Sequence, residues 1–170
     1  MAPFRDQLTR LDDIPGISLR VAEVIIAETG GDMSQFPTAG HLASWAGVSP
    51  GNQKSGGKRK PGKTTKGNRW LRDALGTAAM AAARSKNTYL GAQYARLVRR
   101  LGSKQKALVA LEHSMLTSVW HMLTNDTGYQ DLGADHFLRR DPERERRRAI
   151  TALNKLGYTL NPIEPTPQAA

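Results

Sequence analysis

The chain has 170 residues, enough for one domain with a proper hydrophobic core and too few for two large ones. Its formal net charge of +10 suits a polyanionic partner better than acidic small molecules. The absence of cysteine excludes disulfides and thiolate chemistry, and the absence of a signal peptide or long apolar run predicts a cytoplasmic protein without membrane contact.

Apolar residues recur at helical rather than alternating spacing, which predicts an all-α fold. Capping residues and glycine stops bound the predicted helices, which cover residues 18–29, 38–46, 69–85, 89–101, 103–124 and 142–156. The strongest is 103–124, where Leu108, Leu111, Met115, Val119 and Met122 form an apolar stripe. In the helix 69–85, Trp70 is placed on the apolar face, and no convincing strand is found anywhere.

The predicted domain is one compact helical domain over residues 1–125, which contains a hairpin element at about 10–32 and a basic loop at 47–67. Residues 126–170 form a C-terminal extension with a charged helix and a Pro-rich frayed tail. No internal repeat is found.

The loop 47–67 holds six glycines, two prolines and no apolar residue after Val48, which predicts a long exposed loop. Between Asp32 and Asp73 no acidic residue occurs, so the positive charges of this region are unopposed. They are Lys54, Lys58, Arg59, Lys60, Lys63, Lys66, Arg69 and Arg72. Cations beside glycines can approach phosphates together with backbone N–H groups, so the segment is predicted to bind nucleic acid.

Part of this loop, from Gly57 to Thr64, also satisfies the phosphate-loop pattern G-x-x-x-x-G-K-[ST]. That mechanism needs a buried strand before the pattern and a helix directly after it. The preceding sequence is VSPGNQKSG, which cannot form a core strand. A phosphate-loop nucleotidase is therefore kept only as a minor alternative.

A second nucleic-acid contact is suggested near the N-terminus, where Ile14-Pro15-Gly16-Ile17-Ser18 precedes a helix. The segment is similar to a helix-hairpin-helix, whose glycine turns present backbone amides to a DNA phosphate. Ser18 replaces the usual second glycine and would cap the helix with its hydroxyl. A plain Pro-Gly turn between helices is an equal alternative. Gly16 and Ser18 are the candidate contacts.

No metal site is predicted. Asp126, Asp131, Asp135 and His136 lie close in sequence, but nothing fixes their geometry, and they are interpreted as surface loop residues. The other histidines have no partner at metal-ligand spacing.

Several short motifs follow one another in order: Ile14 to Ile17, Phe36-Pro37, His41 to Pro50, Ser55-Gly56-Gly57-Lys58, and Lys66 to Arg72 before an Ala-rich helix. Taken together they resemble the C-terminal domain of the RNA-guided serine-type insertion-sequence transposases that include the pilin-gene-inverting recombinases. The resemblance covers about residues 8–124.

The resemblance implies DNA transposition or recombination, with Ser55 as the nucleophile that attacks DNA. It also implies a RuvC-like acidic domain that binds Mg²⁺, a homo-oligomer with a shared active site, and in some members a structured guide RNA. Nothing like the acidic domain occurs in this sequence, so we expect a fragment, a truncated reading frame or a subunit that is inactive alone. From the residues themselves, Lys54 and Lys58 could stabilise negative charge near Ser55, and Gly56 and Gly57 leave room for DNA. The alternative is a non-enzymatic basic helix-hairpin-helix module.

Overall fold

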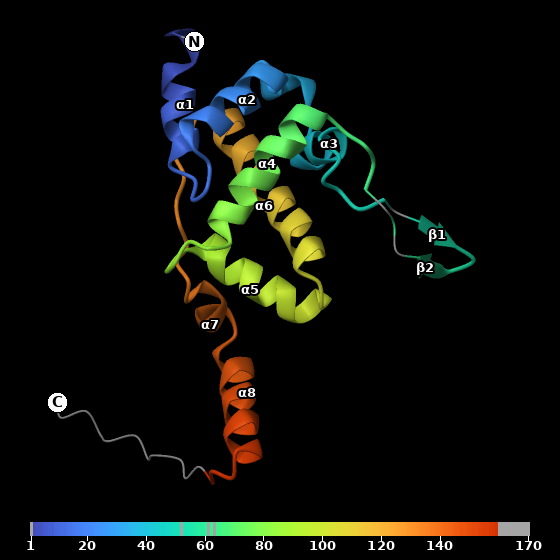
Figure 1. Ribbon diagram of the computed structural model, residues 1–170, viewed down its shortest axis with the longest axis vertical. Helices are drawn as coiled ribbons and strands as arrows, with labels where there is room; N and C mark the ends of the chain where they lie inside the picture. The colour runs from blue at the N-terminus through green and yellow to red at the C-terminus, as the bar shows by residue number, and fades with distance from the viewer. Residues whose placement is uncertain (1, 52, 61, 63, 160–170) are drawn as a thin grey trace, which may run out of the picture. The chain divides into compact units, whose positions relative to one another are not determined.

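The computed structural model describes residues 2–51, 53–60, 62 and 64–159, and of residues 2, 53–55 and 58–60 the backbone alone. The chain divides into two units, Met1–Ala134 and Asp135–Ala170. Eight α-helices and one small two-stranded hairpin occur in the described residues (Figure 1). The predicted all-α fold class is confirmed.

The first unit contains α1 (Arg5–Asp12), α2 (Leu19–Thr29), α3 (Ala39–Trp45), α4 (Arg69–Ala82), α5 (Tyr89–Leu101) and α6 (Lys104–Asn125). Two short 3-10 helices, η1 (Ala2–Phe4) and η2 (Met33–Gln35), lie before α1 and α3. The second unit contains α7 (His136–Arg140) and α8 (Pro142–Lys155). The predicted helices all form. Two described helices were not predicted: α1 precedes the first predicted helix, and α7 lies in a stretch that was expected to be a loop.

Side-chain caps explain why four of these helices begin where the sequence predicts. The side chains of Thr38, Asn68, Thr88 and Ser103 each accept a hydrogen bond from a backbone amide in the first turn of the helix that follows. Each cap satisfies one of the amides that a helix N-terminus leaves without a partner.

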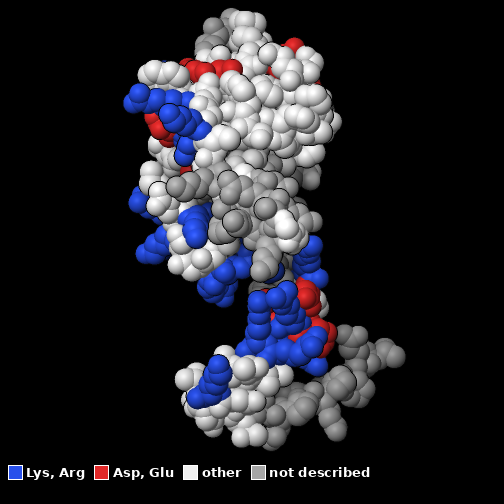
Figure 2. All heavy atoms as spheres, turned by 90° about the vertical axis from the view of Figure 1, so that its right-hand side faces the viewer, with Lys and Arg blue, Asp and Glu red and all other residues white. Residues whose placement is uncertain are grey.

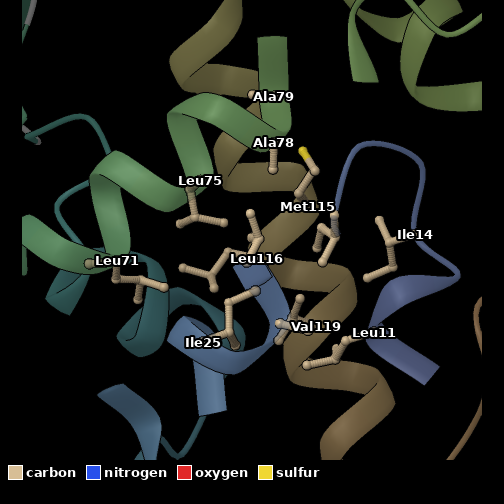
Figure 3. Close-up of a cluster of buried hydrophobic side chains, with 14 of the residues drawn as sticks. Leu11, Ile14, Ile25, Leu71, Leu75, Ala78, Ala79, Met115, Leu116 and Val119 are labelled. Atoms are coloured by element: carbon tan, nitrogen blue, oxygen red, sulfur yellow. The ribbon is translucent and has the colours of Figure 1, made fainter. Parts of the chain in front are cut away.

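Helix α6 is the centre of the core, because it contacts α1, α3, α4, α5 and η2. Figure 3 shows its side chains Met115, Leu116 and Val119 among those of α4, α2 and α1. The predicted stripe of α6 is buried except for Leu108, which is only partly covered. The prediction for Trp70 is wrong: the residue is 67% exposed, since it projects outside the buried face of α4 that Leu71 and Leu75 belong to.

The buried face of α4 is rich in alanine, and Ala78, Ala79 and Ala82 are fully covered. Such small side chains allow other backbone segments to come close. The turn before α2 uses this space: Gly16 has φ +91°, and a Cβ placed there would collide with the backbone of α4 at Ala78 and Ala82. Only glycine fits this approach.

The Gly16→Ala substitution should therefore lower the free energy of unfolding by about 2–4 kcal/mol, through backbone strain and overpacking together. Gly102 is a matched control, because it has φ +64° and open space around its Cβ position. Gly102→Ala should cost only about 1 kcal/mol. Urea unfolding followed by circular dichroism measures both, and equal losses would contradict the packing argument.

Candidate nucleic-acid interface

The basic segment between α3 and α4 forms a two-stranded ribbon rather than the irregular loop that was expected. Strand β1 (Gln53–Ser55) pairs antiparallel with β2 (Lys58–Lys60), and an isolated bridge joins Pro50 to Thr64. The strands were missed because their residues are polar, so the apolar alternation that usually marks a strand is absent.

The ribbon starts and ends at one point of the fold. A Cβ added to Gly47 or to Gly67 would collide with the backbone of the other, so the two segments touch directly. The backbone amide of Asn68 also donates to the carbonyl of Trp45 at 3.3 Å. This junction, which we call the stem, joins the end of α3 to the start of α4, and the strands lie beyond it, away from the helices (Figure 1).

The tip of the ribbon carries the predicted nucleophile. The register pairs Ser55 with Lys58, directly before a two-residue turn formed by Gly56 and Gly57. Both glycines have positive φ, 57° and 75°, as a type I′ hairpin turn requires. Apart from their chain neighbours, no atom lies within 4 Å of a Cβ position at either glycine, so the space beside both glycines is open.

The predicted contacts divide between this tip and the stem. Lys54, Ser55, Lys58, Arg59 and Lys60 lie on the strands, where the backbone alone is described, and Lys63 lies outside the described residues. Lys66, Arg69 and Arg72 follow at the stem and in the first turn of α4.

The structure contradicts the phosphate-loop alternative. Lys58 to Lys60, which would have to wrap around a phosphate, form the extended strand β2. The next helix begins only at Arg69, not directly after Thr64. The helix that the nucleotide-binding mechanism needs directly after the pattern is therefore not in place.

The two arginines of the first α4 turn have different environments. Arg69 is exposed, and its closest carboxylate is that of Asp73, with 3.9 Å between Nε and Oδ2. Arg72 donates from its guanidinium to the backbone carbonyls of Thr65 at 3.3 Å and Lys66 at 3.2 Å. Arg72 therefore anchors the returning arm of the ribbon to α4, a role that the sequence does not reveal.

A groove of about 610 Å³ runs between α4 and α6, and we call it the α4–α6 groove. The groove is lined by one face of each helix and by two residues at the stem. The stem provides Lys66 and Gly67, α4 provides Arg69, Arg72, Asp73, Gly76 and Met80, and α6 provides Gln105, Leu108, Val109 and Glu112. Three of the residues predicted to bind phosphate, Lys66, Arg69 and Arg72, thus line the same groove as α6. Figure 2 shows groups of Lys and Arg side chains (blue) on one face of the molecule.

Glu112 is the unexpected member of this groove. Glu112 is only 8% exposed. Its carboxyl makes no hydrogen bond or ion pair in the described part of the chain. Burial raises the pKa of its carboxyl, and the charge of Arg72 offsets part of that rise. Glu112 is the one acidic residue of α6, and its place between Leu108 and Leu116, four residues away on either side, was the sequence signal that could have marked it.

Two exposed tryptophans flank the stem. Trp70 follows it in α4, and the guanidinium of Arg69 lies 6.0 Å from the centre of its ring. Trp45 precedes the stem and is 39% exposed, with its ring 5.3 Å from that of Phe36. Exposed aromatic rings beside cations are suited to stacking on unpaired bases.

The hairpin element differs in one detail from the prediction. Ser18 occupies the N-cap position of α2 with extended backbone angles, but its side chain makes no capping hydrogen bond, so the predicted hydroxyl cap is wrong. Gly16 is packed against α4, as described above. A phosphate contact at this turn stays a prediction.

The acidic residues of the 126–136 segment have separate partners. Asp126 forms an ion pair with Arg10, and Asp135 forms one with Arg139. The side chain of Asp131 accepts hydrogen bonds from the backbone amides of Tyr89 and Gly133. In the described residues no group of three or more His, Cys, Asp or Glu side chains could hold a metal ion. None of the helices described is both long and apolar enough to span a membrane.

Arg72→Ala should lower the free energy of unfolding by about 1 kcal/mol, because two carbonyls lose a charged donor in a partly exposed site. It should also speed amide exchange at residues 65–68, where the anchored arm joins α4. Arg69→Ala removes the same charge from the same turn and should change stability by less than about 0.5 kcal/mol. Hydrogen-exchange mass spectrometry with urea unfolding measures both effects. Identical exchange in the two variants would refute the anchoring role.

Known proteins are similar to this chain over most of the first unit. Residues 8–95 match the family model of the Transposase IS116/IS110/IS902 family. An insertion element IS110 uncharacterized 43.6 kDa protein from Streptomyces coelicolor is 35% identical over 127 residues, which cover 71% of this chain and 29% of that protein. The chain thus spans less than a third of the length of the relative that it matches. With more than half of its residues matched, the chain belongs to the IS116/IS110/IS902 transposase family.

Proposed function

We propose that this chain is the DNA-handling domain of its transposase and that Ser55 supplies the nucleophile for DNA strand cleavage and exchange. Membership of a transposase family supports the reaction class. The observation that supports the residue is the position of Ser55, at the last strand pair before an open glycine turn. Family membership also favours recombination over a non-enzymatic helix-hairpin-helix module.

A serine at this position can meet the geometric needs of the reaction. A DNA backbone is bulky, and the two turn residues beside Ser55, Gly56 and Gly57, have no side chains to obstruct its approach. In the proposed step the Ser55 oxygen bonds to phosphorus while the bond from phosphorus to a sugar oxygen breaks. The hydroxyl proton passes to a base, and the departing oxygen gains a proton. Lys58, the cross-strand partner, would favour the negative charge that develops on the phosphate.

Phosphate binding would extend from this tip to the stem. The strands of the ribbon would contribute Lys54, Lys58, Arg59 and Lys60, and the stem and the start of α4 would contribute Lys66 and Arg69. Lys63, which lies outside the described residues, is a further proposed contact. These cations would position DNA without reading its sequence, because phosphates are the same at every base. Trp70 adds an exposed ring at which a splayed base could stack.

We further propose that other parts complete the active site. The described residues do not fit a magnesium site, so acidic residues of a RuvC-like domain or subunit would hold Mg²⁺, and no step assigned to this chain depends on the ion. A second copy of the full-length protein and a structured guide RNA are proposed partners. On this view the chain alone does not recombine DNA.

The proposal predicts strongly salt-dependent binding to duplex DNA. If about five phosphates are neutralised, the logarithm of the binding constant should fall with the logarithm of salt concentration with a slope near −4.5. Fluorescence anisotropy across a salt series measures it. Affinity that barely changes with salt would contradict the electrostatic contact.

Replacing Lys58, Arg59 and Lys60 with alanine should weaken binding to all DNA sequences alike and make that slope shallower. A matched control removes three cations from α8 instead, at Arg144, Arg147 and Lys155. The control should change affinity less, because Glu143 and Glu145 already accompany the basic residues of that helix. An equal loss from both triple variants would argue against a contact localised on the ribbon.

Ser55→Ala should abolish recombination by a complex reconstituted with the acidic domain, since it deletes the atom that bonds to phosphorus. DNA affinity should stay nearly unchanged, because the neighbouring cations remain. The matched control is Ser85→Ala, at a half-buried serine outside the ribbon. Mass spectrometry of a trapped protein–DNA adduct locates the modified residue. An adduct on another residue, or full activity of Ser55→Ala, would end the assignment.

A further inference from the structure

The α4–α6 groove combines features that conflict if phosphate is its only ligand. Lys66, Arg69 and Arg72 attract a polyanion, whereas Glu112 repels it. Glu112 makes no hydrogen bond or ion pair among the described residues, and burial disfavours the charged form of its carboxyl. Its oxygens are nevertheless open to the groove, because the buried side-chain atoms without a hydrogen-bond partner in the described residues lie on Gln7 and Gln93. A ligand in the groove can therefore bring hydrogen-bond donors to Glu112.

The position of the carboxylate leaves it accessible from the groove. Its Oε1 atom lies 3.8 Å from the point where a Cβ at Gly76 would stand, so the glycine leaves the space in front of it open. Leu108 and Val109 are on the same face of α6 as Glu112, and Met80 faces them from α4. The groove therefore has apolar side chains, a carboxylate in its wall and cations at its rim.

These three features match the flat face of a nucleotide base, the polar edge of the base and the phosphate. A base can stack on the apolar side chains, its polar edge can face the carboxylate, and its phosphate can reach the cations. The volume of about 610 Å³ lies within the usual range of ligand pockets.

The chemistry of a carboxylate selects among the bases. An ionised carboxylate only accepts hydrogen bonds, and it has two oxygens with which to do so. Guanine alone presents two adjacent donors on its Watson–Crick edge, N1–H and the N2 amino group. Adenine and cytosine each present one amino group beside an acceptor nitrogen, and thymine and uracil present one N–H between two carbonyls.

We infer that the α4–α6 groove binds an unpaired guanine nucleotide, with Glu112 accepting hydrogen bonds from N1–H and N2–H of the base. The guanine must be unpaired, because in a duplex its Watson–Crick edge is already hydrogen-bonded to cytosine. The inference rests on the proposed function in that it names the nucleic-acid feature that this surface reads. It would give the domain a base-specific contact beside the sequence-independent contacts of the ribbon.

The test measures binding of the 170-residue chain to short single-stranded oligonucleotides with one guanine among pyrimidines. The comparison ligand carries inosine, which lacks the N2 amino group, in place of guanine. Both oligonucleotides are made as DNA and as RNA, and the version that binds more tightly shows which nucleic acid provides the guanine. The wild-type chain should bind the guanine strand on the order of tenfold more tightly than the inosine strand, the usual effect of one hydrogen bond to a charged group.

Glu112→Gln should reduce this guanine-to-inosine ratio to about one, because the amide places a donor opposite a donor. Asp73→Asn is the matched control: it lines the same groove and loses the same charge, but its side chain is 71% exposed. It should keep the ratio while raising affinity for both strands. Glu112→Gln should fold, since it removes a buried charge without changing size, and a thermal melt verifies this.

Gly76→Leu gives a second, independent variant, because it fills the space before Glu112 and keeps the carboxylate. It should also abolish the guanine preference. Equal binding of guanine and inosine by the wild-type chain, or an unchanged ratio in Glu112→Gln, would overturn the inference. Salt-dependent binding without a guanine preference would refute the groove site alone, whereas no binding to any nucleic acid would refute the proposed function as well.

Discussion

The close packing of the alanine face of α4 is the constraint on which the rest of the first unit depends. Because Ala78, Ala79 and Ala82 are small and fully buried, α4 can lie near α6 and also receive the Gly16 turn against its backbone. The packing of α4 also sets where its first turn lies in the fold. Because α4 begins directly after the stem, the same packing positions the basic ribbon. The same packing sets the two helix stripes that face each other across the α4–α6 groove. The packing of the core therefore also determines the geometry of the candidate interface.

The candidate interface divides into two regions with different physical character. The ribbon is basic, and the Cβ positions of its two turn glycines are open. The α4–α6 groove is lined by two helices of the packed core and contains a buried acidic residue. Cations that contact phosphates suit affinity for any nucleic acid, and a polar group in an apolar setting suits discrimination between bases. A transposase needs both properties, because it must hold DNA strands and also place them in register.

Helix positions could be predicted from the sequence because local signals specify them. Asn68 caps α4 and Gly102 ends α5, and both signals act within a few residues. The ribbon could not be predicted in the same way, since its strands hold no apolar residues to alternate. The environment of Glu112 depends on which part of α4 lies opposite, and helical periodicity gives a face but not its neighbour. Ser55 became a candidate through family resemblance, because a serine in a basic loop has no local signature of a nucleophile.

The three tryptophans of the chain lie in environments that differ enough to serve as optical reporters. Trp70 and Trp45 flank the stem and are exposed, whereas Trp120 is partly buried and donates its indole N–H to the carbonyl of Phe36 at 2.9 Å. Exposed indoles emit at longer wavelengths and are quenched readily by iodide, and stacking on a base suppresses their emission. The intrinsic fluorescence of the protein thus contains one component from the packed helices and another from the stem, which distinguishes unfolding from ligand contact without any added label.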